Sequence, residues 1–194
     1  MDAMNTQTWI ILGVAVAIVL IALAAYLLYQ KKQSHRLERR FGAEYGRAVE
    51  DLGSRAKAES ELKTREKRVE RLHIIPLAPA EAARFSQAWK ALQGNFVDNP
   101  KGVVVQADQL VRELLLKRGY PMGDFEHRAA DISVDHPAVV SNYRAAQAIA
   151  ARGEADTEDL RKAVVHYRAL FDELLETSKD TQPVMPAKQM EVQS

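Results

Sequence analysis

The chain has 194 residues, with 27 Lys or Arg against 26 Asp or Glu, and a net charge of +1. A charge this close to zero excludes a protein whose whole surface is basic, as in many nucleic-acid-binding proteins. Cysteine is absent, which excludes disulfide bonds, thiol catalysis and cysteine-ligated zinc or iron–sulfur sites.

One apolar run, Trp9 to Tyr29, has only Gly13 outside the apolar set. As a helix it would be roughly 31 Å long, close to the hydrocarbon thickness of a bilayer, about 30 Å. A buried core helix seldom stays apolar around its whole circumference, and a signal peptide needs a shorter apolar core after a basic segment. The run therefore predicts one transmembrane helix, residues 9–29, that is retained as an anchor.

The charges beside this run predict its orientation. No Lys or Arg precedes it, whereas five follow it directly: Lys31, Lys32, Arg36, Arg39 and Arg40. Because flanks rich in Lys and Arg stay on the cytoplasmic side, we expect residues 1–8 to form a short outside tail and the bulk of the chain to be cytoplasmic. The same five side chains are also candidates for binding anionic lipid headgroups.

Residues 30–72 predict a charged, amphipathic helical stalk. From Lys31 to Leu72 there are 13 Lys or Arg against 8 Asp or Glu, and β-branched residues are few. A kink is expected near Phe41–Gly42. The apolar stripe has two interpretations: a coiled coil that forms a homodimer, or a single helix that lies on the bilayer or folds back on the following domain. The dimer would use Phe41, Tyr45, Ala48 and Leu52.

Residues 73–177 predict a compact bundle of four to five helices. Prolines at 76 and 79 end the stalk, and apolar residues then recur at helical spacing in four helices and one short piece. Each of these helices is apolar along one stripe only, so they must pack together. Trp89 is expected to be the central aromatic residue. Residues 178–194 have no periodicity and predict a disordered tail.

The densest polar stretch runs from Asp124 to His136. Asp124, His127 and Asp131 would share one face of a helix and are candidate ligands of a divalent metal; together with His136 they are the candidate catalytic residues of a metal-assisted hydrolase. Capping explains the same residues: Asp124 lies where a helix begins, and Ser133 or Asp135 could cap the helix that Pro137 opens. We favour the caps, because isolated motif matches are often false.

Several long strings are distinctive in combination: FGAEYGRAVEDLGSRAKAESEL (41–62), RFSQAWKALQGNFVDNP (84–100), KRGYPMGDFEHRAADISVDHP (117–137), NYRAAQAIA (142–150) and DLRKAVVHYRALFDELL (159–175). Together they resemble an uncharacterised family of small bacterial single-pass membrane proteins. The resemblance implies an inner-membrane protein with a cytoplasmic all-helical domain. It implies no activity.

These patterns predict an all-α, membrane-anchored interaction or scaffold module with an unknown protein partner. No phosphate-binding loop and no serine-hydrolase signature occurs, so an enzyme is less favoured and no cofactor is expected. Binding of anionic lipid or nucleic acid by the basic stretch after the anchor is a further alternative. Nucleic acid is the weaker of these two, because few aromatic residues alternate with the basic ones.

Overall fold

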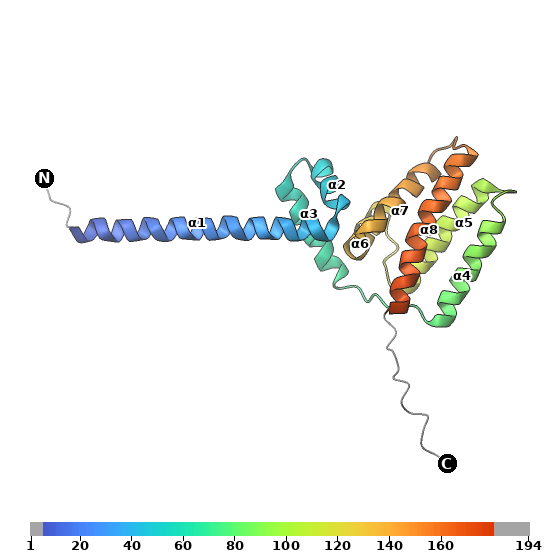
Figure 1. Cartoon of the computed structure of the whole chain (residues 1–194), viewed down its shortest axis with the longest axis horizontal. Helices are drawn as coiled ribbons and strands as arrows, with labels where there is room; N and C mark the ends of the chain where they lie inside the picture. The colour runs from blue at the N-terminus through green and yellow to red at the C-terminus, as the bar shows by residue number, and fades with distance from the viewer. Residues whose placement is uncertain (1–5, 181–194) are drawn as a thin grey trace, which may run out of the picture.

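The computed structural model describes residues 6–180, and within that range every regular element is a helix (Figure 1). The predicted all-α class is confirmed. Of the predicted tails, 1–5 and 181–194 lie outside the described residues, whereas 6–8 belong to α1 and 178–180 continue α8, so the helices extend beyond the predicted bounds. The eight helices are α1 (Thr6–Phe41), α2 (Ala43–Leu52), α3 (Arg55–Val69), α4 (Pro79–Gly94), α5 (Pro100–Arg118), α6 (Phe125–Asp135), α7 (Pro137–Ala150) and α8 (Thr157–Asp180).

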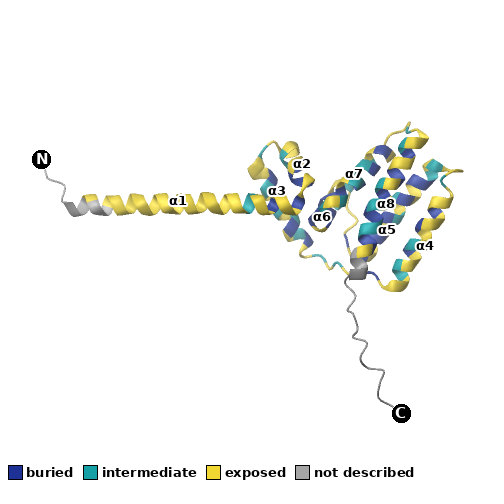
Figure 2. Ribbon diagram, viewed as in Figure 1, coloured by how far each residue is buried: buried dark blue, intermediate teal, exposed yellow. Residues whose placement is uncertain are grey.

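α1 is one continuous helix of 36 residues that extends the apolar run without a break. Figure 2 shows its apolar length exposed and away from the rest of the chain, and the side chains from Leu12 to Tyr29 are all exposed. Within the described residues it is the one helix long and apolar enough to cross a membrane. A membrane anchor and an amino-terminal signal sequence both fit these properties.

The predicted stalk is instead a small folded unit. α1 ends at Phe41, where Gly42 has a φ of 51°, and α2 ends at Gly53, where φ is 63°. Glycine adopts positive φ readily, so each of these positions lets the chain turn. We call Lys31–Leu72 the N-terminal unit. It has its own core, made of Leu37, Phe41, Tyr45, Ala48, Ala58, Leu62 and Val69 together with Val134 of α6.

Two contacts give the directions of the helices in this unit. Ser34 Oγ donates to Glu59 Oε1 at 2.6 Å, and Arg36 further along α1 donates to Glu66 further along α3. α3 therefore runs alongside α1 in the same direction. α2 must return the chain, so the turn between α2 and α3 points back along α1 toward its apolar part (Figure 1).

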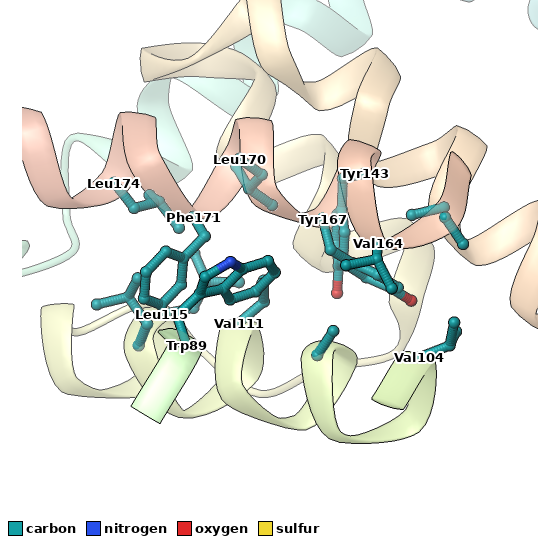
Figure 3. Packing of buried hydrophobic residues seen from close by; sticks show 14 of the residues in the cluster. Trp89, Val104, Val111, Leu115, Tyr143, Val164, Tyr167, Leu170, Phe171 and Leu174 are labelled. Carbon is teal, nitrogen blue, oxygen red and sulfur yellow. The ribbon is translucent and has the colours of Figure 1, made fainter. Parts of the chain in front are cut away.

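The five remaining helices form the predicted bundle around a second core. Trp89 of α4 is 2% exposed and stacks on Phe171 of α8, with ring centroids 4.6 Å apart. Figure 3 shows this pair above Val111 and Leu115 of α5, with Tyr143 and Tyr167 further along the same core. The central position of Trp89 is thus confirmed.

The segment between the two units is extended and fixed to the bundle. The Ile75 amide donates to the Arg118 carbonyl at 2.9 Å, and Leu77 is buried in the bundle core. Gly119 ends α5 with a φ of 95°, and a Cβ there would lie 2.4 Å from the carbonyl oxygen of His73. This glycine is therefore required both by its backbone conformation and by the close approach of the 73–78 segment.

α6 belongs to both cores. Ala129 and Ile132 are buried in the bundle, whereas Val134 packs into the N-terminal unit. Because α6 is covered on two sides, its described residues from Ala129 to Val134 are all buried. The N-terminal unit is therefore packed directly on the bundle and is not a separate stalk.

Candidate functional site

Asp124 and His127 lie at the exposed start of α6. The Asp124 carboxylate accepts the His127 amide at 2.9 Å through Oδ1, and its Oδ2 lies 2.8 Å from His127 Nδ1. The backbone and side-chain hydrogen bonds from His127 lower the pKa of Asp124 below its ordinary value. Asp124 is thus the N-cap of α6, as the sequence predicted.

Asp131 lies one helical turn beyond His127 on α6 and is buried. Its Oδ1 accepts Arg68 Nε at 2.7 Å and lies 2.6 Å from Arg68 Nη2. Arg68 belongs to α3, so this ion pair joins the N-terminal unit to the bundle. The carboxylate is therefore engaged by an arginine and does not face His127.

His136 lies at the junction of α6 and α7 and is buried. Its Nδ1 is 3.1 Å from Glu173 Oε1 of α8. The sequence predicted that Ser133 or Asp135 would cap α7, and that prediction is wrong. Ser133 Oγ donates to the Ala130 carbonyl within α6, and Asp135 Oδ2 accepts the Tyr120 hydroxyl at 3.4 Å. His136 itself is the N-cap residue, and its side chain makes no cap hydrogen bond.

The four candidates for a metal site thus separate into an exposed pair at 124 and 127 and two buried residues with different partners. The helix spacing was read correctly, but Asp131 turns inward to α3, while Asp124 and His127 face solvent. Across residues 6–180, no group of three or more His, Asp or Glu side chains is placed to hold a metal ion. The four residues form no common site.

The residues that the structure does bring together are buried carboxylates and arginines between the two units. Glu44 of α2, 4% exposed, accepts Arg144 of α7 through both oxygens, at 3.1 and 3.3 Å. Arg65 of α3 approaches the same carboxylate at 3.8 Å, and Glu126 of α6 contacts the other side of Arg144. We call Glu44, Arg65, Arg68, Glu126, Asp131 and Arg144 the junction cluster.

The electrostatics of the junction cluster favour the charged state of Arg144. Burial alone would lower the pKa of this guanidinium, but the hydrogen bonds to Glu126 and Glu44 outweigh it and raise the pKa above its ordinary value. Bidentate pairing also fixes the orientation of the two side chains relative to each other, because the planar guanidinium and carboxylate groups must align. The cluster therefore holds α2 and α3 in a defined position on α6 and α7.

A second buried polar group lies at the end of α5. Arg118, 4% exposed, donates from Nη1 to the Leu174 carbonyl at 3.1 Å. Burial lowers the pKa of Arg118, and nearby Tyr120, Asp135 and Glu173 act in the opposite direction. Together with the His136–Glu173 contact, this group joins the ends of α5, α6 and α8 within the bundle. Four polar residues of the 117–137 string, Arg118, Tyr120, Asp135 and His136, belong to this group.

The predicted lipid-binding residues divide into two sets. Arg36 and Arg40 both pair with Glu66 of α3, at 2.7 and 3.1 Å. Their charge is thus partly neutralised within the chain. Lys31, Lys32 and Arg39 are exposed, and none of these three takes part in an ion pair within the described part of the chain. All five side chains are exposed, so what separates the two sets is the ion pair with Glu66.

The residues predicted for self-association are placed within the protomer. Phe41, Tyr45 and Ala48 are buried in the core of the N-terminal unit, and Leu52 is partly exposed at the end of α2. The stripe that predicted a coiled coil is therefore used for intramolecular packing. This is the alternative in which the segment folds back on the domain, although it does so as three helices and not as one.

Sequence reasoning missed the junction cluster. Glu44 and Arg144 are 100 residues apart, and Arg68 and Asp131 are 63 apart, so no local spacing relates them. One signal was present. In α2, α3 and α7, charged residues occupy helix positions next to the apolar stripe, whereas charged residues on a solvent-exposed face lie farther from the stripe.

Comparison with protein-family models, curated proteins and solved structures finds no match for this chain. Its function is therefore inferred from its own residues.

Proposed function

We propose that this chain is a membrane-anchored interaction module, with α1 in the inner membrane of a bacterium and the helical bundle on the cytoplasmic face. The exposed apolar helix supports the anchor, and the basic residues after it support the orientation. The resemblance of its sequence strings to small bacterial membrane proteins supports the source. The bundle would then bind a protein partner at the membrane surface.

The observation that carries this proposal is the junction cluster. α1 continues without a break into the N-terminal unit, and buried ion pairs then fix that unit to α6 and α7. A flexible tether would let the bundle rotate and move away from the bilayer. A rigid junction presents one constant face of the bundle at one height, which is useful for a scaffold and unnecessary for a diffusing enzyme.

The placement of the polar residues supports the same choice. Asp124, Asp131 and His136, the core of the alternative hydrolase site, each serve a different structural contact. A hydrolytic site needs its acid, base or metal ligands to converge on one substrate position. The described side chains supply capping and ion pairing in place of such convergence.

Two measurements test the proposal. Fusion of alkaline phosphatase or of a fluorescent protein after Leu175 reports the orientation: a fluorescent fusion without phosphatase activity is expected, and the reverse result would invert the topology. Metal analysis of the purified full chain, with His127→Ala and Asp131→Ala, tests the hydrolase alternative. Stoichiometric metal that is lost in both variants would overturn the interaction module.

A further inference from the structure

A groove lies between α1 and α3 beside the end of the apolar run. Tyr26, Tyr29 and Gln33 line it from α1, and Arg55, Ser60 and Lys63 line it from α3. The sequence did not predict this groove, because α3 was expected to continue away from the anchor. The same-direction packing of α1 and α3 is what returns the start of α3 to the level of Tyr26 and Tyr29.

We infer that this groove binds the phosphate headgroup of an anionic phospholipid from the membrane that holds α1. The inference rests on the proposed anchoring of α1. Tyrosines prefer the membrane–water interface, where the ring is in apolar surroundings and the hydroxyl meets water. Tyr26 and Tyr29 therefore place the groove at the depth of the lipid headgroups.

The charges in the groove suit an anion. The Arg55 side chain is largely exposed, and its Nε donates to the Tyr45 hydroxyl at 2.7 Å, which fixes the position of the guanidinium. Lys63 is a second cation on the same wall, two turns along α3. A guanidinium and an ammonium on one wall offer several donors to phosphate oxygens, and both act where solvent screening is incomplete.

The carboxylate in the groove wall is already satisfied by other groups. Glu59 Oε1 accepts the Ser34 hydroxyl at 2.6 Å and the Tyr45 hydroxyl at 2.9 Å, while Arg55 Nε lies farther away, at 3.8 Å. Arg55 also forms an ion pair with Glu59, so the groove wall carries two cations, Arg55 and Lys63, against one carboxylate. Lys31 and Lys32, exposed on α1 just beyond Tyr29, add to the positive potential around the groove.

The groove also explains the partly exposed Leu52. This residue ends α2, three residues before Arg55 in the chain, and its side chain is 39% exposed. An apolar side chain next to cations is the arrangement by which peripheral helices contact a bilayer, with the apolar group among the acyl chains and the cations at the phosphates. The α2–α3 turn and the groove would thus contact the same leaflet.

The test uses the purified full chain in detergent micelles, titrated with phosphatidylglycerol or phosphatidylcholine, with bound lipid counted by native mass spectrometry. We expect at least about tenfold tighter binding of phosphatidylglycerol. Arg55→Gln with Lys63→Gln should reduce this preference roughly 10- to 30-fold, since each basic residue near a membrane surface contributes roughly fivefold. The matched control is Lys90→Gln with Lys101→Gln, which removes the same charge from exposed bundle positions and should leave the preference unchanged.

Two outcomes would overturn the inference. One is equal binding of both lipids by the unaltered chain. The other is a preference lost in Lys31→Gln with Lys32→Gln but kept in Arg55→Gln with Lys63→Gln, which would assign the effect to α1 alone.

Alkaline carbonate extraction of membranes separates these results from failure of the proposed membrane anchoring. A chain released without detergent has no anchor, whereas a chain that stays in the membrane without lipid preference contradicts only the groove. Circular dichroism of each variant confirms that the helices are intact.

Discussion

Arg144 of α7 and Glu44 of α2, 100 residues apart in the chain, are joined by two hydrogen bonds in which each guanidinium donor meets a different carboxylate oxygen. Both side chains are nearly buried, with exposed fractions of 11% and 5%. A buried ion pair adds little net stability over an apolar pair of the same shape, but removal of one partner leaves a charge uncompensated. The pair thus acts mainly on the position of the N-terminal unit.

The first prediction follows from this asymmetry. Arg144→Ala should lower the free energy of unfolding by about 3–5 kcal/mol, because Glu44 would remain buried without its two hydrogen bonds and with only Arg65, 3.8 Å away, as a counter-charge. Glu126→Ala is the matched control: it removes the exposed partner of the same guanidinium and should cost at most about 1 kcal/mol. Urea unfolding of the full chain in detergent measures both. Equal losses in the two variants would show that burial of Glu44 is not what makes the pair important.

A second prediction concerns Gly119, where α5 ends against the segment that joins the units. Gly119→Ala should be strongly destabilising, because it combines positive φ with a Cβ that meets the His73 carbonyl. Gly53→Ala separates the two effects. Gly53 also has positive φ, 63°, but its Cβ would meet nothing within 4 Å, so only the backbone cost of about 1–2 kcal/mol is expected.

Thermal unfolding of the two glycine variants gives the comparison directly. The Gly119 variant should lose more stability than the Gly53 variant. If the losses are equal, the 73–78 segment can move away from α5 at no cost, and the close packing of the two units on each other is weaker than the structure indicates.

The third prediction is alkaline unfolding of the bundle. Burial raises the pKa of Tyr120, Tyr143 and Tyr167 above the ordinary value of 10.0. A folded pKa raised above the unfolded pKa gives stability that is complete below about pH 10 and is lost as pH rises toward the folded pKa values. The chain should therefore lose stability progressively above pH 10.

Tyrosinate absorbance and circular dichroism, followed together between pH 8 and 13, measure this loss. Four of the six tyrosines, the three of the bundle and Tyr45 of the N-terminal unit, whose pKa burial also raises, should ionise only as helicity disappears. Tyr167→Phe should leave three such residues. It also removes the hydroxyl hydrogen bonds to Asp108 and Gln147, both 3.1 Å, so its stability at neutral pH is the necessary reference. Ionisation of all six tyrosines in a chain that is still helical would contradict the prediction.

The bundle could be predicted from the sequence and the N-terminal unit could not, for a physical reason. Stripes such as the one through Trp89 report that a face is buried, and in a chain with several such helices the faces bury one another. Caps are local, so the Asp124 cap could be predicted from four residues of sequence. The stripe through Phe41 and Tyr45 reported burial equally well, but burial in a dimer and burial in a folded unit leave the same pattern.

The spacing of apolar residues shows that a helix face is buried, but it does not show which residues cover that face. The direction of α3, the groove beside Tyr29 and the pairing of Glu44 with Arg144 all depend on chain reversals at Gly42 and Gly53. The sequence indicated a kink near the first glycine within a helical stalk. The structure uses both glycines as turns with positive φ.

The last prediction tests the bundle core through Trp89. Trp89→Ala should lower the free energy of unfolding by about 3–5 kcal/mol, a large part of the 5–15 kcal/mol typical of a domain, because the stacked contact with Phe171 and the burial under α5 and α8 are both lost. Trp89→Phe keeps an aromatic ring on Phe171 and should cost less.

Fluorescence measures these losses. The chain has two tryptophans, so a Trp9→Phe background leaves Trp89 as the sole tryptophan. Because Trp9 lies on exposed α1, that change should not alter bundle stability. A blue-shifted emission that moves to the red in one transition with the loss of helicity is expected. An unchanged melting temperature for Trp89→Ala would place the centre of the bundle elsewhere.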